Sequence, residues 1–216
     1  MADRGRKIIS GSGTAKADQA LTESIPATAP SGPEAIIFAT KRWLETAVIG
    51  LNLCPFAKAV HVKGQIRYIV CESDSREVLL TELVRELAFL ASADLAETDT
   101  TLLIHPHLFN DFLDYNDFLE VADTAIAELK LDGVIQIASF HPHFQFADTE
   151  PDEITNYTNR SPYPTLHLLR EESVSRAVAA FPEADEIFER NMQTMEKLGH
   201  DGWRKLAMVG ASTNSD

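Results

Sequence analysis

Two histidine–proline–histidine tripeptides have the residue types and spacing that most directly suggest chemistry. The first occupies residues 105–107 after the apolar run TTLLI, and the second occupies residues 141–143 after the apolar run VIQIASF. Imidazole is the commonest metal ligand, and its unperturbed pKa of about 6.5 suits proton transfer near neutral pH. In an extended His-Pro-His segment the two imidazoles point the same way, because side chains repeat every second residue.

The histidines that directly follow the two apolar runs, His105 and His141, are therefore candidate acid/base residues or ligands of a divalent metal ion. With His107 and His143 they would supply up to four nitrogens, although the spacing matches no established zinc signature. The alternative role is structural: each proline ends a strand, and each histidine hydrogen-bonds a neighbouring carbonyl group. The residues alone leave all three interpretations open.

The segment NYTNRSPYPTLHLLRE, residues 156–171, is the densest polar stretch of the chain. A guanidinium group recognises carboxylate or phosphate through two parallel hydrogen bonds, so Arg160 and Arg170 are candidates for holding a small anion. Asn159 lies beside the first arginine, and His167 faces either the core or the same site. The alternative for Arg170 is a solvated ion pair with one of the glutamates that follow it.

A cysteine in the segment LNLCPFAKAV, Cys54, is a candidate nucleophile. The proline after it can open a short helix, and the dipole at a helix N-terminus lowers the pKa of a thiol. The alternative is an inert, partly buried cysteine of the kind that we expect for Cys71 at the end of a strand.

Composition limits the classes of function. The chain has 216 residues, 44% of them hydrophobic, which predicts one sizeable core, and its formal charge of -14 disfavours nucleic acid and anionic membranes as partners. No apolar segment approaches the ~20 residues of a membrane-spanning helix, and the start of the chain lacks the apolar stretch of a signal peptide. We therefore expect a soluble, cytoplasmic protein with reduced thiols.

The hydrophobic pattern predicts a disordered tail at residues 1–33 and a single α/β domain at residues 34–210. Strands are expected near residues 66–71, 100–105 and 134–140, with a fourth near 165–169 and helices between the first three. Strands joined by helical crossovers run parallel, so we expect a small, mainly parallel sheet packed by helices. The site would then lie at the carboxyl ends of the strands, where His105 and His141 meet.

Four motifs together resemble a family of bacterial and plant proteins catalogued as a domain of unknown function: LNLCPFAK, DFLDYNDFL, FHPHFQFADTEPDE and NYTNRSPYPTLHLLREESVSRAV. The resemblance spans residues 35 to about 207 and implies no particular activity, cofactor or substrate. The positions that match the family pattern are Cys54, His105, His141, Asn159, Arg160, His167 and Arg170. His107 and His143 are more variable in that pattern, which favours a site built from His105, His141 and the Asn-Arg loop.

These observations favour an enzyme that acts on a small anionic substrate, a carboxylate or a phosphate, through a His/Arg/Asn pocket. Metal assistance is an open alternative within that hypothesis. The second hypothesis is a non-catalytic module that binds a metabolite or a protein partner. The sequence does not indicate an oligomeric state.

Overall fold

Four short apolar runs form the strands of one sheet. They are β1 (Ile66–Val70), β2 (Thr100–Ile104), β3 (Ile135–Phe140) and β4 (Thr165–Arg170). The computed structural model describes residues 32–180 and 186–209, and all but the last two residues of the expected tail at residues 1–33 lie outside this part.

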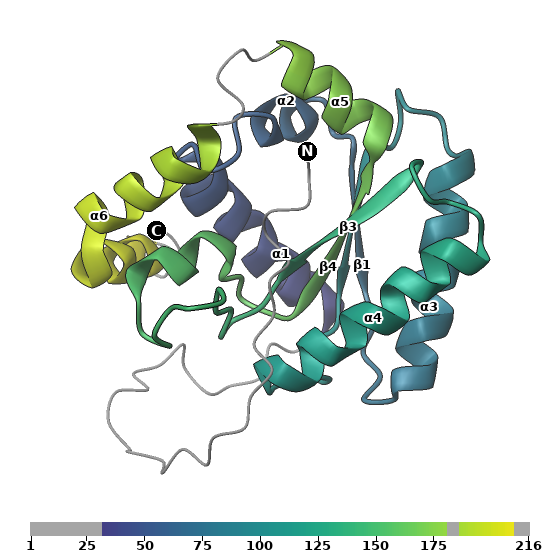
Figure 1. Cartoon of the computed structure of the whole chain (residues 1–216), viewed down its shortest axis with the longest axis horizontal. Coiled ribbons are helices and arrows are strands. Elements are labelled where there is room, and N and C mark those ends of the chain that lie inside the picture. The colour runs from purple at the N-terminus through teal and green to yellow at the C-terminus, as the bar shows by residue number, and fades with distance from the viewer. Residues whose placement is uncertain (1–31, 181–185, 210–216) are drawn as a thin grey trace.

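The strands follow the order β1-β2-β4-β3 across the sheet (Figure 1). β1 and β2 pair in parallel, whereas β4 pairs antiparallel with both of its neighbours. The α/β class is thus confirmed, but the expected mainly parallel pairing needs correction. No long helix links β3 to β4, only a single short 3-10 helix, η2 (Ile154–Asn159), so the chain turns back between β2 and β3. β2 and β3 still run in the same direction and end at the same edge.

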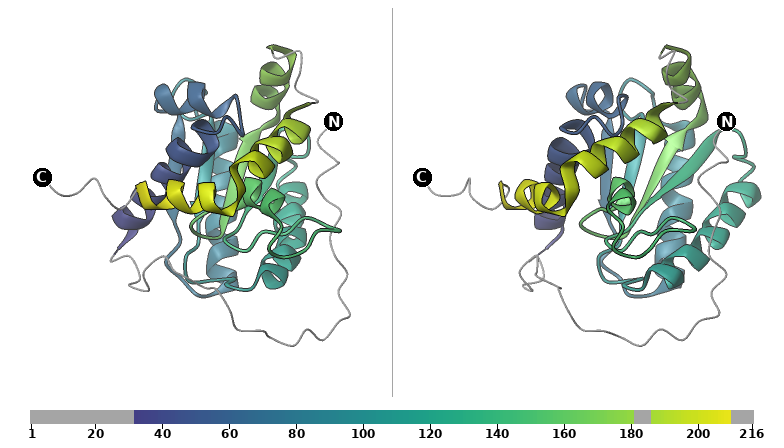
Figure 2. Two further views of the ribbon diagram at one scale, coloured as in Figure 1. Left: turned by 90° about the vertical axis from the view of Figure 1, so that its left-hand side faces the viewer. Right: turned by 60° about the vertical axis from the view of Figure 1, so that its left-hand side comes forward.

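Helices lie on both sides of this sheet. Their bounds are α1 (Pro33–Trp43), continued by a π-helical turn η1 (Leu44–Ile49), then α2 (Ala57–Val62), α3 (Arg76–Ser92), α4 (Phe112–Glu128), α5 (Glu171–Ala180) and α6 (Ile187–Val209), the last interrupted at Gly199. The turned views in Figure 2 bring α6 forward, on the side away from α3 and α4. No helix in the described ranges is long and apolar enough to cross a membrane.

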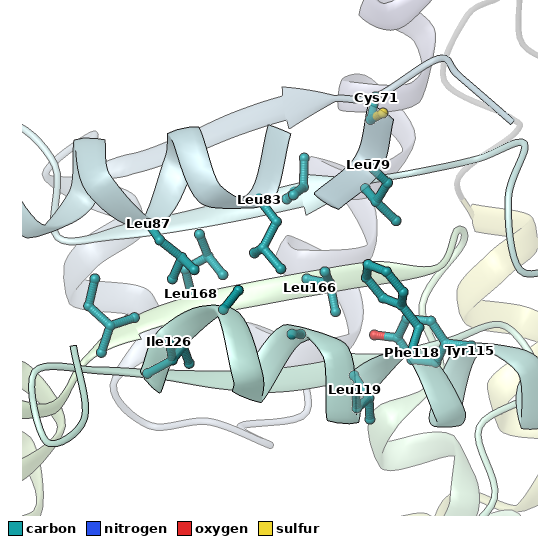
Figure 3. Close-up of a cluster of buried hydrophobic side chains, with 14 of the residues drawn as sticks. Cys71, Leu79, Leu83, Leu87, Tyr115, Phe118, Leu119, Ile126, Leu166 and Leu168 are labelled. Carbon is teal, nitrogen blue, oxygen red and sulfur yellow. The ribbon is translucent and has the colours of Figure 1, made fainter. Parts of the chain in front are cut away.

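The face of the sheet beneath α3 and α4 carries the main core, and we call it the α3/α4 face. Figure 3 shows leucines of α3 meeting Leu166 and Leu168 of β4, with side chains of α4 closing the other side. Alternate residues of the same strands point to the opposite face, which we call the α1 face, because Leu102 and Ile104 pack there against Ile36 of α1. The two faces therefore bury separate clusters.

Helix α4 begins at the edge where β2 ends, and its start has a local cause. The Asp111 carboxylate accepts hydrogen bonds from the backbone N–H groups of Leu113 at 2.8 Å and Asp114 at 3.3 Å. An acid in this position satisfies N–H groups that the helix cannot pair itself. The cap fixes the first turn of α4, which carries Tyr115 into the core.

A buried ion pair connects the edge strand β1 to α3. The Arg67 guanidinium donates from Nε at 2.7 Å and from Nη2 at 3.2 Å to the carboxylate of Glu86, whose side chain is 1% exposed. The same guanidinium lies 4.3 Å from the centroid of the Phe89 ring. A carboxylate so deeply buried is stable only while these donors remain in place.

Removal of the Glu86 carboxylate should destabilise the fold. We expect Glu86→Ala to lower the free energy of unfolding by about 2 kcal/mol, because it leaves a partly buried guanidinium without its partner. Glu172→Ala is the matched control, since it breaks the exposed Arg176–Glu172 pair and should cost less than about 0.5 kcal/mol. Urea denaturation measures the free energy of unfolding of both variants. Equal losses in the two variants would contradict a stabilising role for the Arg67–Glu86 pair.

Candidate functional site

The edge where β2 and β3 end brings the two expected histidines together, and we call it the histidine rim. His105 and His141 both point to the α3/α4 face, and both rings stack against Tyr115 of α4, with centroids 5.6 and 5.2 Å from the tyrosine centroid. Each histidine is 0% exposed. The expected proximity of the two residues is therefore found, but in a closed environment.

His141 uses both of its ring nitrogens for backbone contacts. Its Nε2 lies 2.8 Å from the carbonyl oxygen of Phe109, and its Nδ1 accepts the backbone N–H of His143 at 2.9 Å. Nε2 must then carry the proton, because a carbonyl only accepts. This imidazole links the loop after β2 to the loop after β3 and leaves no nitrogen for a metal or a substrate.

His105 is nearly as enclosed. Its Nδ1 donates to the Leu108 carbonyl at 3.3 Å, while its Nε2 is buried and has no hydrogen-bond partner among the described residues. Burial lowers the pKa of His105 to about 4, and it lowers that of His141 to the same value. Both imidazoles are thus neutral at pH 7, which suits packing against Tyr115 and Phe109.

The Asn-Arg loop lies beside this rim, and its polar side chains also bind backbone. Arg160 donates from Nε to the Phe144 carbonyl at 3.3 Å and from Nη2 to the Pro151 carbonyl, and its guanidinium lies 4.0 Å from the Tyr157 ring centroid. Within the described residues no carboxylate lies within ion-pair distance of it. Asn159 donates to Ser139 at 3.3 Å, so it covers the outer edge of β3. Ligand contact by Arg160 stays a prediction, and its contacts are those of a residue that braces the loop.

Arg170 lies at the opposite end of the sheet, because β4 runs against β2 and β3. It pairs with Ile135, the first residue of β3, and its Nη2 donates to the carbonyls of Ala93 at 2.7 Å and Thr98 at 3.2 Å. Those carbonyls follow the C-terminus of α3, where a cation also meets the negative end of the helix dipole. Arg170 therefore lies away from His105 and His141, and a role for it in ligand binding stays a prediction.

His167 lies in the middle of β4 and points to the α1 face, away from the rim. Its Nε2 is 2.7 Å from the hydroxyl of Thr100, and its ring centroid is 6.0 Å from that of Phe140. Burial lowers its pKa to about 4, although the side chain keeps partial contact with solvent. The residues expected to form one substrate pocket are thus divided between both ends and both faces of the sheet.

Cys54 lies in the loop between η1 and α2, beside a cluster around Trp43. Burial raises the pKa of its thiol, against smaller opposing contributions from the backbone N–H groups of Phe56 and Ala57. A nucleophilic thiol needs a lowered pKa, so the electrostatics give that role no support. Cys71 is buried and its pKa is also raised by burial.

The metal hypothesis finds no support in the geometry. Within residues 32–180 and 186–209, no three side chains of His, Cys, Asp or Glu are arranged to hold a metal ion. His107 and His143 are exposed and do not complete a ligand set with the two buried histidines.

A pocket of about 290 Å³ lies elsewhere, between the loop at residues 51–55 and α6, and we call it the loop–α6 pocket. Asn191 of α6 donates to the Leu53 carbonyl at 2.8 Å, which ties the two walls together. The described residues that line it are Leu51, Asn52, Pro55, Ile187, Arg190, Asn191, Gln193, Thr194 and Lys197. Two of these residues are basic and none is acidic, in a chain whose formal charge is -14.

The α6 residues of this pocket were not predicted from the sequence. Arg190 and Lys197 belong to an amphipathic helix, where basic side chains are ordinary surface residues. The only available signal was the motif LNLCPFAK, which contributes the other wall.

Comparison with known proteins gives one match. The family model described as Protein of unknown function (DUF1415) matches residues 35–205, which confirms the resemblance seen in the motifs. No curated protein and no solved structure matches the chain.

The buried histidines predict a pH-dependent stability. The pKa values of His105, His141 and His167 are about 4 in the folded chain, against about 6.5 when unfolded. Between these values only the unfolded chain binds the protons, so stability present above pH 6.5 is lost as the pH falls. The free energy of unfolding should decrease by up to about 1.4 kcal/mol per pH unit for each histidine.

Urea denaturation between pH 7.5 and 5 measures this slope. His167→Gln should make it shallower, whereas the same change at the exposed His107 should not. A free energy of unfolding that is constant from pH 7 to pH 5 would refute the lowered pKa values of the buried histidines.

Arg160→Lys separates a bracing role from ligand contact. An ammonium group cannot donate to both carbonyls while it stacks on Tyr157, so we expect a loss of about 1 to 2 kcal/mol in stability. Phosphate affinity, measured by titration calorimetry, should stay unchanged. Arg176→Lys at an exposed position is the control, and weakened phosphate binding at unchanged stability would show that Arg160 contacts the ligand.

Proposed function

We propose that this chain, which belongs to the DUF1415 family of proteins of unknown function, binds a small anionic molecule in the loop–α6 pocket. The observation that carries the proposal is the composition of the pocket wall, in which the described residues place Lys197 beside amide side chains and include no carboxylate. The ligand class is a carboxylate or a phosphate, as the sequence analysis anticipated, but the site differs from the one expected there.

Electrostatics favour an anion at this place over most others on the surface. The chain carries 33 acidic and 19 basic residues, so an anion meets repulsion over much of the protein. Lys197 supplies a positive charge at the pocket, and the amides of Asn52 and Asn191 supply hydrogen-bond donors. The charge of Lys197 is therefore opposite in sign to the net charge of the chain.

The size of the pocket fits a small metabolite. A volume of about 290 Å³ lies at the lower end of the range of small-molecule sites, about 300–1,000 Å³. The hydrogen bond between Asn191 and the Leu53 carbonyl holds the walls in place before a ligand arrives, which lowers the ordering cost of binding.

Binding, rather than conversion, is the function that this wall supports. The lining residues that the structure describes include no His, Cys, Asp or Glu, which are the side chains that most often act as acids, bases or nucleophiles. Enzymatic turnover would need such a group to come from the ligand or from outside the lining. The non-catalytic, metabolite-binding hypothesis therefore fits the pocket better than the enzyme hypothesis does.

Replacement of Lys197 tests the proposal. Inorganic phosphate and succinate are the probes, and titration calorimetry at low salt measures their affinity for the full chain. We expect Lys197→Gln to weaken binding about fivefold, as for one partly exposed charge-assisted contact. Binding should also weaken when the ionic strength rises, because salt screens exposed charges.

Lys205→Gln is the matched control. It removes the same charge from the same helix at an exposed position that does not line the pocket, and it should leave affinity unchanged. No binding of either anion, or equal losses in both variants, would refute the proposal.

A further inference from the structure

The α1 face of the sheet is covered unevenly. On β2 the side chains of this face are buried, with Thr100, Leu102 and Ile104 at most 6% exposed. On β3 and β4 five neighbouring side chains of the same face are only half-buried, and we call them the β3–β4 patch: Gln136, Ala138, Phe140, His167 and Leu169. The patch combines two polar groups with an aromatic ring on the edge strand β3 and its neighbour β4.

The tautomer of His167 follows from its neighbour. The Thr100 hydroxyl donates its only hydrogen to the Leu168 carbonyl, so towards the imidazole it can only accept. His167 must then donate from Nε2, which lies 2.7 Å from that hydroxyl. The other nitrogen, Nδ1, carries a lone pair, and no described residue donates a hydrogen bond to it. Burial keeps the ring neutral at pH 7 by lowering its pKa to about 4.

The strand register places a second polar group within reach of this lone pair. Ala138 lies directly opposite His167 in the β3–β4 pairing. Gln136 precedes Ala138 by two residues on β3, so its side chain points to the same face. Diagonal neighbours of this kind lie about 7–8 Å apart between Cα atoms, which a small planar molecule can bridge. The Gln136 side chain is half-buried and makes no side-chain hydrogen bond to a described residue, and its amide can both donate and accept.

Apolar groups complete the surroundings of this pair. Ala138 is next to both polar residues in the strand pairing, opposite His167 and two residues after Gln136. A larger side chain at position 138 would fill the space beside His167 and Gln136. The Phe140 ring centroid is 6.0 Å from the imidazole, and the Trp43 ring meets Phe140 edge-on at 5.1 Å. A flat ring can pack on such a surface while its polar edge meets the histidine and the glutamine.

We propose that the β3–β4 patch binds a neutral planar ring that carries a cyclic imide or amide. The ring N–H donates to Nδ1 of His167, the adjacent ring carbonyl accepts from the Gln136 amide, and the ring packs over Ala138 and against Phe140. This site is distinct from the loop–α6 pocket in both residues and chemistry, because it recognises a neutral hydrogen-bond pattern instead of a charge.

Two matched probes test this pattern. Uracil has the required N–H and carbonyl groups, whereas 1,3-dimethyluracil keeps the ring and the carbonyls but has no N–H. Two-bond ¹H–¹⁵N spectra of the full chain report the imidazole nitrogens of each histidine. Free His167 should show a protonated Nε2 and an unprotonated Nδ1, and uracil should shift Nδ1 in a saturable manner, while 1,3-dimethyluracil should not.

Variants then connect the response to the patch. His167→Gln keeps a donor for Thr100 but removes the Nδ1 lone pair, and we expect uracil affinity to fall about tenfold with little change in melting temperature. Gln136→Ala should weaken it by a similar factor. His107→Gln, the same substitution at an exposed histidine outside the patch, should have no effect.

Three results would overturn the proposal: no saturable response to uracil, an equal response to the two probes, or unchanged uracil affinity in both patch variants. Phosphate affinity distinguishes this failure from that of the proposed function. It depends on Lys197 and should be the same in the wild-type chain and in His167→Gln.

Discussion

The hydroxyl of Tyr115 is buried in the main core, and its hydrogen bond to the Thr165 carbonyl at 2.8 Å is the constraint on which the rest of the rim depends. That bond ties the first turn of α4 to the first residue of β4. The tyrosine ring also stacks against the two histidines that end β2 and β3. A buried hydroxyl without a partner is costly, so α4 and the strand ends must assemble together. Burial raises the pKa of this tyrosine, which keeps it neutral and able to donate.

Strand direction was predictable from the sequence, whereas strand pairing was not. Helices α3 and α4 are long enough to cross over the sheet, so β1, β2 and β3 had to run the same way, and this places His105 beside His141. β4 inserts between β2 and β3, and no local pattern in its sequence TLHLLR indicates which strands it pairs with. The all-buried pattern of β2 is consistent with a partner on each side, but it does not identify the partners.

The roles of the polar residues were less predictable, because the same side chain serves a ligand or a backbone carbonyl equally well. His141, Arg160 and Arg170 all donate to main-chain carbonyl groups in loops or at helix ends. Such carbonyls are invisible in a sequence, since every residue has one and only the fold decides which of them lack partners. A segment rich in donors therefore indicates a loop with many carbonyls to satisfy as readily as it indicates a ligand site. The basic residues of α6 were overlooked for the opposite reason. An exposed lysine on a helix looks like an ordinary surface residue in the sequence, and only the fold shows that a loop faces it and forms a pocket.

The polar side chains on the two faces of the sheet differ in how many of their hydrogen bonds are made within the fold. On the α3/α4 face and at the rim, many polar groups are paired within the fold, and the exceptions among the buried atoms of the described residues are the Oγ1 of Thr101, the Nε2 of His105 and the Nε of Arg170. On the other side of the sheet, His167 and Gln136 are half-buried, and no described residue hydrogen-bonds Nδ1 of His167 or the side-chain amide of Gln136. Unused capacity at an accessible position costs little, because water satisfies it, and a ligand that replaces this water gains contact area at the same time. Residues of the β3–β4 patch can therefore be replaced without disturbing the core, whereas those of the rim cannot, because they hold β2, β3 and α4 together.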